Sequence, residues 1–295
     1  MCPVPDPANF SIRSITSPHE FHLAEILQRD VWGIRDDTEI VPKDILLIVQ
    51  KNGGLCLGAF DQNDELAGLL FGFLGQTADK KWKHCSHMLG VLPAYRNSGI
   101  SSSLKKAQRD FVLQQGLDLI TWTVSPLEGK NSSLNFRKLG GVCRNYLPNF
   151  YGDMEDELNH GIPSDRFEME WWIRSRRVEN RLQTGLIQTF PGIQQPEKMI
   201  VNPTILENEI RIPKVNTSAS TPLTSFLFEV PADIQLIKKN AIDKAVSWID
   251  HTRKSLEQYF RDGFIITDFF TEVLSGERRN FFLLEKNLTA ILENE

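Results

Sequence analysis

The stretch from Met88 to Leu104 constrains this chain more than any other part of its sequence. It opens as an apolar strand that Pro93 ends, and a loop of small polar residues then leads into an amphipathic pattern, predicted as a helix over 101–115. Backbone N–H groups at the start of such a helix bind anions, usually a phosphate. Arg96 adds a planar cation at the mouth of the loop, and Gly99 lets the backbone approach a ligand closely.

Two well-known phosphate loops are excluded, because the chain has neither G-x-x-x-x-G-K-[ST] nor G-x-G-x-x-G. What stands here is Arg96-x-x-Gly99-x-Ser101. Taken alone, so short a pattern favours an ordinary strand-to-helix turn with a solvated arginine. The choice between that turn and an anion site therefore depends on the rest of the chain.

Composition places the chain among soluble globular proteins, with 41% apolar and 24% charged residues over a length of 295 that suits two domains. A net charge of −5 gives no overall attraction to nucleic acid or to anionic membranes. No apolar run approaches the length of a membrane span, and the first residues lack the features of a signal peptide. Four scattered cysteines without disulfide spacing suggest a reducing compartment, so we expect a cytoplasmic protein: Cys2, Cys56, Cys85 and Cys143.

The order of predicted elements is that of a mixed α/β sheet. Ser17, Pro18 and Glu20 form a capping box that starts a helix with an apolar face of Phe21, Ala24, Ile26, Leu27 and Val31. The helix over 101–115 has Leu104, Ala107, Phe111 and Val112 on one face and places Lys105 elsewhere. The run 44–49 is too short to distinguish helix from strand. Strands are predicted at 10–15, 55–60, 66–73, from about 84 to 92, 117–124, 142–151 and 166–173, with a short helix within 127–137.

Two domains joined by a linker are expected: residues 8–175, a linker over 176–204, and a smaller α/β domain over 205–295. The arginines near position 175 are interpreted as a solvated connector. The C-terminal part is predicted to hold strands at 209–212, 225–230, 264–270 and 280–284, with one long helix that starts at about Asp233 or Asn240 and ends at Arg261. Its strand–helix–strand order is either a degenerate copy of the first domain or a coincidence of common elements, and it contains no second Arg-x-x-Gly loop.

Two motifs in the expected order resemble a known family. The residues from His87 to Ile100 resemble the central motif of the GNAT N-acetyltransferases, and those from Asn131 to Gly140 look like the motif that follows it. The resemblance covers roughly residues 10–175. Over this range the chain is similar to an uncharacterised GNAT subfamily that has an extra C-terminal domain. It implies a splayed mixed sheet flanked by helices.

The resemblance also implies an acyl-coenzyme A, acetyl-CoA above all, as co-substrate. An acyl group would pass to an amine of a small molecule, an amino acid or a protein. By the same resemblance, the backbone around Gly90 would pair with the pantetheine arm through Leu89 and Val91, and Asn131 would contact the coenzyme after the next strand. The loop residues expected to surround the pyrophosphate are Arg96, Asn97, Ser98, Gly99, Ile100 and Ser101.

The catalytic acid is where this sequence departs from the family. Phe136 stands where many relatives have a tyrosine, and a phenyl ring cannot protonate a leaving thiolate. Tyr146 and Tyr151 are the nearest alternatives. Transfer without a dedicated acid is the other interpretation, because a thiol with a pKa of about 8.5 is a fair leaving group.

The histidines of the opening strand are candidates for a catalytic base and for a metal site. His87 is a candidate base, although the residue pattern favours a histidine satisfied within the sheet, and His84 is expected on the opposite face. A strand cannot bring His84, Cys85 and His87 to one side, so we predict no metal site. The acidic loop of Asp153, Glu155, Asp156 and Glu157 either attracts a cationic acceptor or is simply solvated.

A non-catalytic module with a GNAT-like fold, binding coenzyme A or a protein partner, is the main alternative to an enzyme. A nucleic-acid-binding protein that uses its arginine-rich segment conflicts with the net charge of −5. No membrane partner is expected. A homodimer built by the C-terminal domain is left open.

Overall fold

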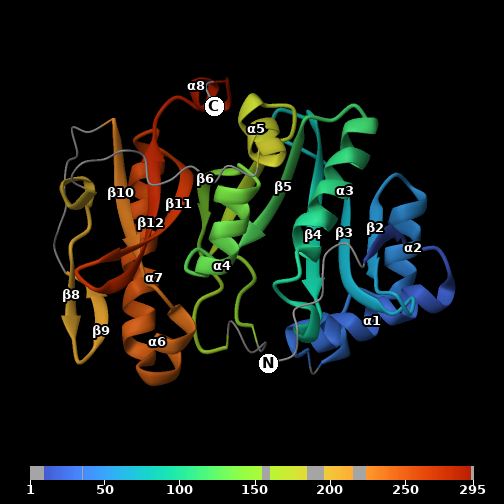
Figure 1. Ribbon diagram of the computed structural model, residues 1–295, viewed down its shortest axis with the longest axis horizontal. Helices are drawn as coiled ribbons and strands as arrows, with labels where there is room; N and C mark the ends of the chain where they lie inside the picture. The colour runs from blue at the N-terminus through green and yellow to red at the C-terminus, as the bar shows by residue number, and fades with distance from the viewer. Residues whose placement is uncertain (1–9, 35, 155–159, 185–195, 215–223, 294–295) are drawn as a thin grey trace. The chain divides into compact units, whose positions relative to one another are not determined.

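The computed structural model describes residues 10–34, 36–154, 160–184, 196–214 and 224–293 (Figure 1). These residues form two compact units, 10–122 and 123–154 with 160–293, and each is described by itself. Both combine strands and helices, which confirms the predicted mixed α/β class. No helix within the described ranges is long and apolar enough to cross a membrane. The predicted boundary at residue 175 stays a prediction.

The first unit is a sheet in the order β1-β2-β3-β4-β5 (Figure 1). The first four strands are antiparallel neighbours, whereas β5 is parallel to β4 and pairs with it only at His84 with Ile120 and at Cys85 with Thr121. The strands are β1 (Ser11–Ser14), β2 (Leu55–Phe60), β3 (Leu66–Gln76), β4 (Trp82–Val91) and β5 (Leu119–Val124), of which the last two residues of β5 fall in the second unit.

The helices of this unit begin where the sequence predicts. The capping box of Ser17 and Glu20 starts α1 (Pro18–Trp32), and a left-handed Gly33 ends it. The ambiguous run 44–49 is helical, within α2 (Lys43–Lys51). Two short 3-10 turns, η2 (Asp37–Glu39) and η3 (Pro93–Tyr95), precede α2 and α3 (Ile100–Gln114) respectively.

Two apolar layers sandwich this sheet. Phe21 and Leu27 of α1 pack on one face, together with Leu46 of α2, and Ile100 and Leu104 of α3 pack on the other. The prediction for Ile26 was wrong, since this side chain is 39% exposed. Its position points away from the stripe that α1 buries against the sheet.

The second unit has the antiparallel strand order β7-β6-β11-β12-β10 (Figure 1). Helix α7 packs against β6, and aromatic rings fill the core beneath the sheet. A separate hairpin joins β8 to β9. The strands are β6 (Val142–Leu147), β7 (Arg166–Trp172), β8 (Thr204–Glu207), β9 (Ile210–Pro213), β10 (Ser225–Val230), β11 (Ile265–Leu274) and β12 (Glu277–Glu285).

The helical elements of this unit include the predicted short helix, which is α4 (Gly129–Ser132) continued by the π-helix η4 (Ser133–Lys138). Both starts considered for the long predicted helix are helix starts, because Ala241, whose backbone is extended, separates α6 (Ile234–Asn240) from α7 (Ile242–Arg261). The later start, near Asn240, agrees with α7. The others are α5 (Arg176–Thr184), η5 (Pro196–Met199) and α8 (Leu288–Glu293).

The basic segment predicted as a solvated connector is a helix that buries two of its arginines. In α5 the Arg177 Nε donates to the carbonyl oxygen of Gly140 at 3.0 Å, and the Arg181 Nη2 lies 2.9 Å from Asp268 Oδ2. The solvated interpretation was therefore wrong for Arg177 and Arg181. Both guanidinium groups are buried because backbone oxygens and a buried carboxylate accept their hydrogens.

The topology also separates the proposed internal copy from the first unit. In the first unit β4 and β5 are parallel neighbours, whereas β12 lies between β10 and β11 in the second. The two strand–helix–strand segments therefore share element order but not sheet order.

Candidate functional site

The candidate anion loop lies between β4 and α3, as the sequence predicts. Asn97 and Gly99 are both left-handed, with φ of +66° and +87°, and Gly99 is the N-cap residue of α3. Glycine adopts this region without strain, whereas a β-carbon is disfavoured there. Within the described residues no side chain caps α3, and its first turn contains no acidic residue. The first amides of α3, including those of Ile100 and Ser101, thus keep their capacity to bind an anion.

The loop is held in shape by its own polar groups. The Ser98 hydroxyl, which is buried, donates to the carbonyl oxygen of Tyr95 at 2.6 Å. The exposed Arg96 side chain donates to the carbonyl oxygens of Val91 and Val31 at 3.5 and 3.4 Å. Ser98 is thus a loop-shaping residue, while Arg96 is the exposed cation beside the helix start.

The edge of β4 next to this loop is where the parallel pairing stops. On one side Leu89 and Val91 pair with β3, opposite Leu70 and Gly68. On the other side the pairing with β5 does not continue past Cys85. An extended chain can add to such a strand edge through backbone hydrogen bonds.

His87 is the extra residue of a β-bulge. The register changes between Phe71 opposite Met88 and Gly72 opposite Ser86, which leaves His87 between the two pairs. Its ring lies edge-on to Phe71 at a centroid distance of 6.2 Å, while much of the side chain is exposed. Partial desolvation by the neighbouring protein atoms lowers its pKa. A histidine with a lowered pKa is neutral at pH 7 and so is able to accept a proton.

His84 lies on the opposite face, as alternation predicts, with its ring 6.3 Å from that of Phe111 of α3. Within the described residues both of its ring nitrogens are buried without a hydrogen-bond partner. Burial, followed by the charge of Lys105, lowers the pKa of His84 to about 4.

Lys105 is buried, whereas the sequence pattern placed it off the apolar face of the helix. Only 2% of Lys105 is exposed, because it joins the buried stripe of α3 with Leu104, Gln108 and Val112. The Nζ atom lies 2.9 Å from Ser86 Oγ and 3.2 Å from Gln108 Oε1. Its helical spacing from Gln108 and Val112, three and seven residues on, is the signal that could have indicated a buried position.

The candidates of the second unit differ in their surroundings. Asn131 is exposed on α4, and its predicted contact with the coenzyme stays a prediction. Phe136 is fully buried, with its ring edge-on to Phe282 at 5.5 Å and to Phe167 at 6.3 Å. This phenylalanine is a core residue, consistent with a position that supplies no proton.

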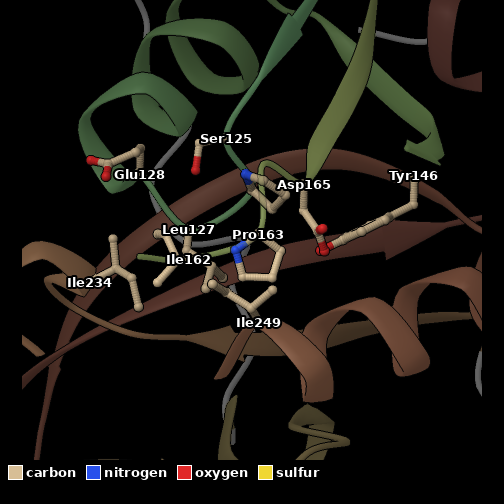
Figure 2. A pocket seen from close by; sticks show the side chains of 10 residues that line it. Ser125, Leu127, Glu128, Tyr146, Ile162, Pro163, Asp165, Ile234 and Ile249 are labelled. Atoms are coloured by element: carbon tan, nitrogen blue, oxygen red, sulfur yellow. The ribbon is translucent and has the colours of Figure 1, made fainter. Parts of the chain in front are cut away.

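Tyr146 borders a small pocket in the second unit, shown in Figure 2. Its hydroxyl donates to Asp165 Oδ2 at 2.7 Å, and Arg253 donates to both oxygens of the same carboxylate. Burial and the neighbouring Asp165 raise the pKa of Tyr146 well above its usual value. Because its proton is held so firmly, Tyr146 is a poor acid at neutral pH. The other pocket walls are largely apolar: Leu127, Ile162, Pro163, Ile234 and Ile249.

Tyr151 is 46% exposed, and its hydroxyl lies 2.9 Å from Thr123 Oγ1. Of the acidic loop, Asp153 is exposed, while Glu155, Asp156 and Glu157 lie outside the described residues. No group of metal-ligating side chains is found in the parts of the chain that the structure describes.

Comparison with known proteins gives matches among solved structures, whereas no family model and no curated protein matches this chain. The Escherichia coli ribosomal-protein-S18-alanine N-acetyltransferase shares 15% identity over 56% of this chain and 94% of its own, with a TM-score of 0.43. A GNAT acetyltransferase of Streptococcus pneumoniae shares 17% over 55% of this chain and 98% of its own, with a TM-score of 0.45.

A putative GNAT acetyltransferase of Desulfovibrio desulfuricans matches in the same way, with 17% identity over 56% of this chain and 99% of its own, at a TM-score of 0.42. Two of these three structures are described as GNAT acetyltransferases. With TM-scores below 0.5 they describe a likeness of fold over about half of the chain. We derive the function from the loop itself.

Proposed function

We propose that this chain is an acyl-coenzyme A-dependent N-acyltransferase that transfers an acyl group, acetyl above all, to an amine of a small molecule, an amino acid or a protein. The observation that carries the proposal is the start of α3. Gly99 is left-handed, and neither a capping side chain nor an acidic residue occupies the first turn in the described structure. Such a helix start suits a pyrophosphate.

The strand before the loop supports the same assignment. An acyl-coenzyme A consists of a pyrophosphate joined to an extended pantetheine arm that carries hydrogen-bonding amides. The edge of β4 past Cys85 offers backbone groups to that arm at Leu89 and Val91, beside the loop. Arg96, exposed at the mouth of the loop, supplies positive charge for the phosphates.

His87 is the proposed base. It stands at a bulge in the strand that would bind the arm, and its lowered pKa keeps it neutral at pH 7. A neutral imidazole can take the proton that an ammonium acceptor must lose before it attacks a thioester.

The alternative, a coenzyme-binding or protein-interaction module without turnover, is favoured by two observations. Phe136 is a core residue, and Asp165 holds the proton of Tyr146. Neither residue is suited to protonate a thiolate at neutral pH.

Calorimetric titration with acetyl- and succinyl-coenzyme A tests the proposal, followed by a colorimetric assay of thiol release with a panel of amines and peptides. Binding with thiol release supports the enzyme. Binding without release for every acceptor supports the non-catalytic module, and the absence of both heat and thermal stabilisation contradicts either function.

A further inference from the structure

A buried lysine lies at the fork where β4 and β5 separate. Ser86 and Trp122 are the first residues beyond the last pair of the two strands, Cys85 with Thr121. The Lys105 Nζ is 2.9 Å from Ser86 Oγ and 3.7 Å from the centroid of the Trp122 ring. An oxygen acceptor and the face of an indole both stabilise a cation.

This position is costly for a lysine, because burial removes the ammonium from water. The other large side chains that α3 buries near its start, Ile100 and Leu104, pack in an apolar cluster. Ionisable groups held in unfavourable surroundings occur preferentially at functional sites. The surroundings of Lys105 therefore indicate a functional role in addition to a packing role.

The fork lies at the far end of the strand edge that begins at the loop. Ser86 lies five positions before Val91 on β4, which corresponds to roughly 16 Å of strand. A coenzyme whose pyrophosphate is bound at Gly99 and whose arm follows β4 past Leu89 would bring its sulfur toward Ser86. This reasoning rests on the proposed function.

We propose that the Lys105–Ser86 pair supplies the proton to the thiolate that leaves when the acyl group is transferred. Ser86 would touch the sulfur, and Lys105 would act through it as a positioning residue. The pair would thus take the place of the acid that Phe136 cannot provide and that Tyr146, with its proton held by Asp165, is poorly suited to be.

In the proposed step one bond forms, one bond breaks, and each proton passes from a named donor to a named acceptor. The acceptor nitrogen forms a bond to the thioester carbonyl carbon, and the carbon–sulfur bond breaks with its electron pair on sulfur. Sulfur takes the proton of the Ser86 hydroxyl, which is replaced by a proton from the Lys105 ammonium. The attacking nitrogen gives up a proton to a base, and solvent later reprotonates Lys105.

The acidity of the groups at the fork is compatible with this role. Burial lowers the pKa of Lys105 to about 7, close to that of a thiol, about 8.5. His84 is the titratable group that faces Lys105 from β4, and its pKa of about 4 leaves it neutral at pH 7. Two side chains that contact Lys105, Trp122 of β5 and Gln108 of α3, are uncharged.

The ionisation of bound coenzyme A tests this proposal without knowledge of the acceptor. The ultraviolet absorbance of the thiolate is followed against pH in the wild type, Lys105→Met, Ser86→Ala and a control, Lys106→Met, which changes the exposed neighbour of Lys105. In the wild type and the control, we expect the thiol to ionise at a lower pH than in the other two variants, because a hydrogen bond from Ser86 and the protonated fraction of Lys105 both favour the thiolate.

Turnover provides a second readout. Release of thiol from acetyl-coenzyme A is expected to lose about a hundredfold in kcat in Lys105→Met, with KM unchanged within a factor of about three. Ser86→Ala repeats the test with a smaller change should the methionine variant fail to fold. Unchanged ionisation and unchanged kcat in the folded variants would overturn the proposal.

Coenzyme binding separates this proposal from the proposed function. If calorimetry shows that the wild type does not bind coenzyme A, both proposals fall. If the wild type binds it and both variants ionise and turn over as the wild type does, only the role of Lys105 and Ser86 is overturned.

Discussion

Each unit of this protein contains a strand that leads through a proline into a helix, and the two junctions differ at the first helical turn. In the second unit, the Asp233 carboxylate accepts the Leu236 amide of α6 at 3.0 Å. In the first unit, the corresponding place before α3 is taken by Gly99, which has no side chain to accept an amide. A capped helix satisfies its own N–H groups, whereas α3 leaves them for a ligand.

The buried face of α3 also differs from that of α7, the long helix of the second unit. Helix α7 buries an almost entirely apolar face that includes Trp248 and Leu256, whereas α3 buries Lys105 and Gln108. A similar order of elements has thus produced one helix that serves packing and one that retains polar groups next to the sheet.

The largest expected effect concerns the buried charge of α3. Lys105→Met should raise the free energy of unfolding near pH 7 by several kcal/mol, because one pKa unit is worth about 1.4 kcal/mol. The pKa of Lys105 falls from 10.5 to about 7 in the folded chain. Between these values the unfolded chain binds a proton that the folded chain does not, so wild-type stability rises with pH across that window.

Chemical denaturation at a series of pH values measures this difference. Relative to Lys105→Met, the wild type should gain stability from about pH 7 upward, and Lys106→Met, on the exposed face, should follow the wild type. Parallel pH curves for the wild type and Lys105→Met would contradict the burial of a titrating lysine.

The next effect concerns the two ends of α3. Gly99→Val should weaken acetyl-coenzyme A binding at least a hundredfold, because a branched side chain is disfavoured at a φ of +87° and would stand beside the helix start. Gly116, at the other end of the same helix, has a φ of +76° and open space around it. Gly116→Val therefore applies a similar backbone strain as a control.

Calorimetric titration of both valine variants checks this prediction, with circular dichroism to confirm folding. Gly116→Val should bind the coenzyme as the wild type does. Equal losses in the two variants would indicate a general effect of strain and would count against a ligand at Gly99.

A smaller effect is expected at the mouth of the loop. Arg96→Met should weaken binding about tenfold, and the loss should shrink as salt is added, since phosphate contacts of an exposed arginine are screened. Arg29, which forms an exposed ion pair with Asp37 at 2.9 Å, provides the control variant Arg29→Met. Affinity measured at low and high salt would contradict the assignment if both variants behaved alike.

The smallest effect belongs to the second unit. Asp233→Ala removes the cap of α6 and should lower stability by about 1 kcal/mol without changing coenzyme binding. Thermal unfolding combined with calorimetry measures both quantities. A loss of coenzyme affinity in this variant would contradict the proposal that the start of α3, and not that of α6, binds the ligand.

The local features of the first unit were predictable because neighbouring residues determine them. Ser17 and Glu20, three positions apart, cap α1. The position of Gly99 at the start of α3 was predictable from the strand, the proline and the small polar loop that precede the helix. For the long helix of the second unit the sequence offered two starts, near Asp233 and near Asn240, and the structure has a helix beginning at each, on either side of Ala241. The sequence marks where helices begin more clearly than where they are interrupted.

Burial of charged groups was less predictable, because it depends on partners distant in the sequence. Arg181 is buried against Asp268, 87 positions away, and Arg253 pairs with Asp165, 88 positions away. Lys105 likewise lies against Ser86 of another element. Hydrophobic periodicity assigns charged residues to positions outside the core, which is why a connector was predicted at α5 and Lys105 was placed off the apolar face of α3.

The central claim is that the start of α3 binds the pyrophosphate of an acyl-coenzyme A. Calorimetry with acetyl-coenzyme A and with acetyl-pantetheine, which lacks the pyrophosphate, tests it most directly in the wild type and in Gly99→Val. The wild type should prefer the complete coenzyme at least a hundredfold, and the variant should bind both ligands with the same weak affinity. A wild type that binds both equally, or binds neither, would contradict the claim.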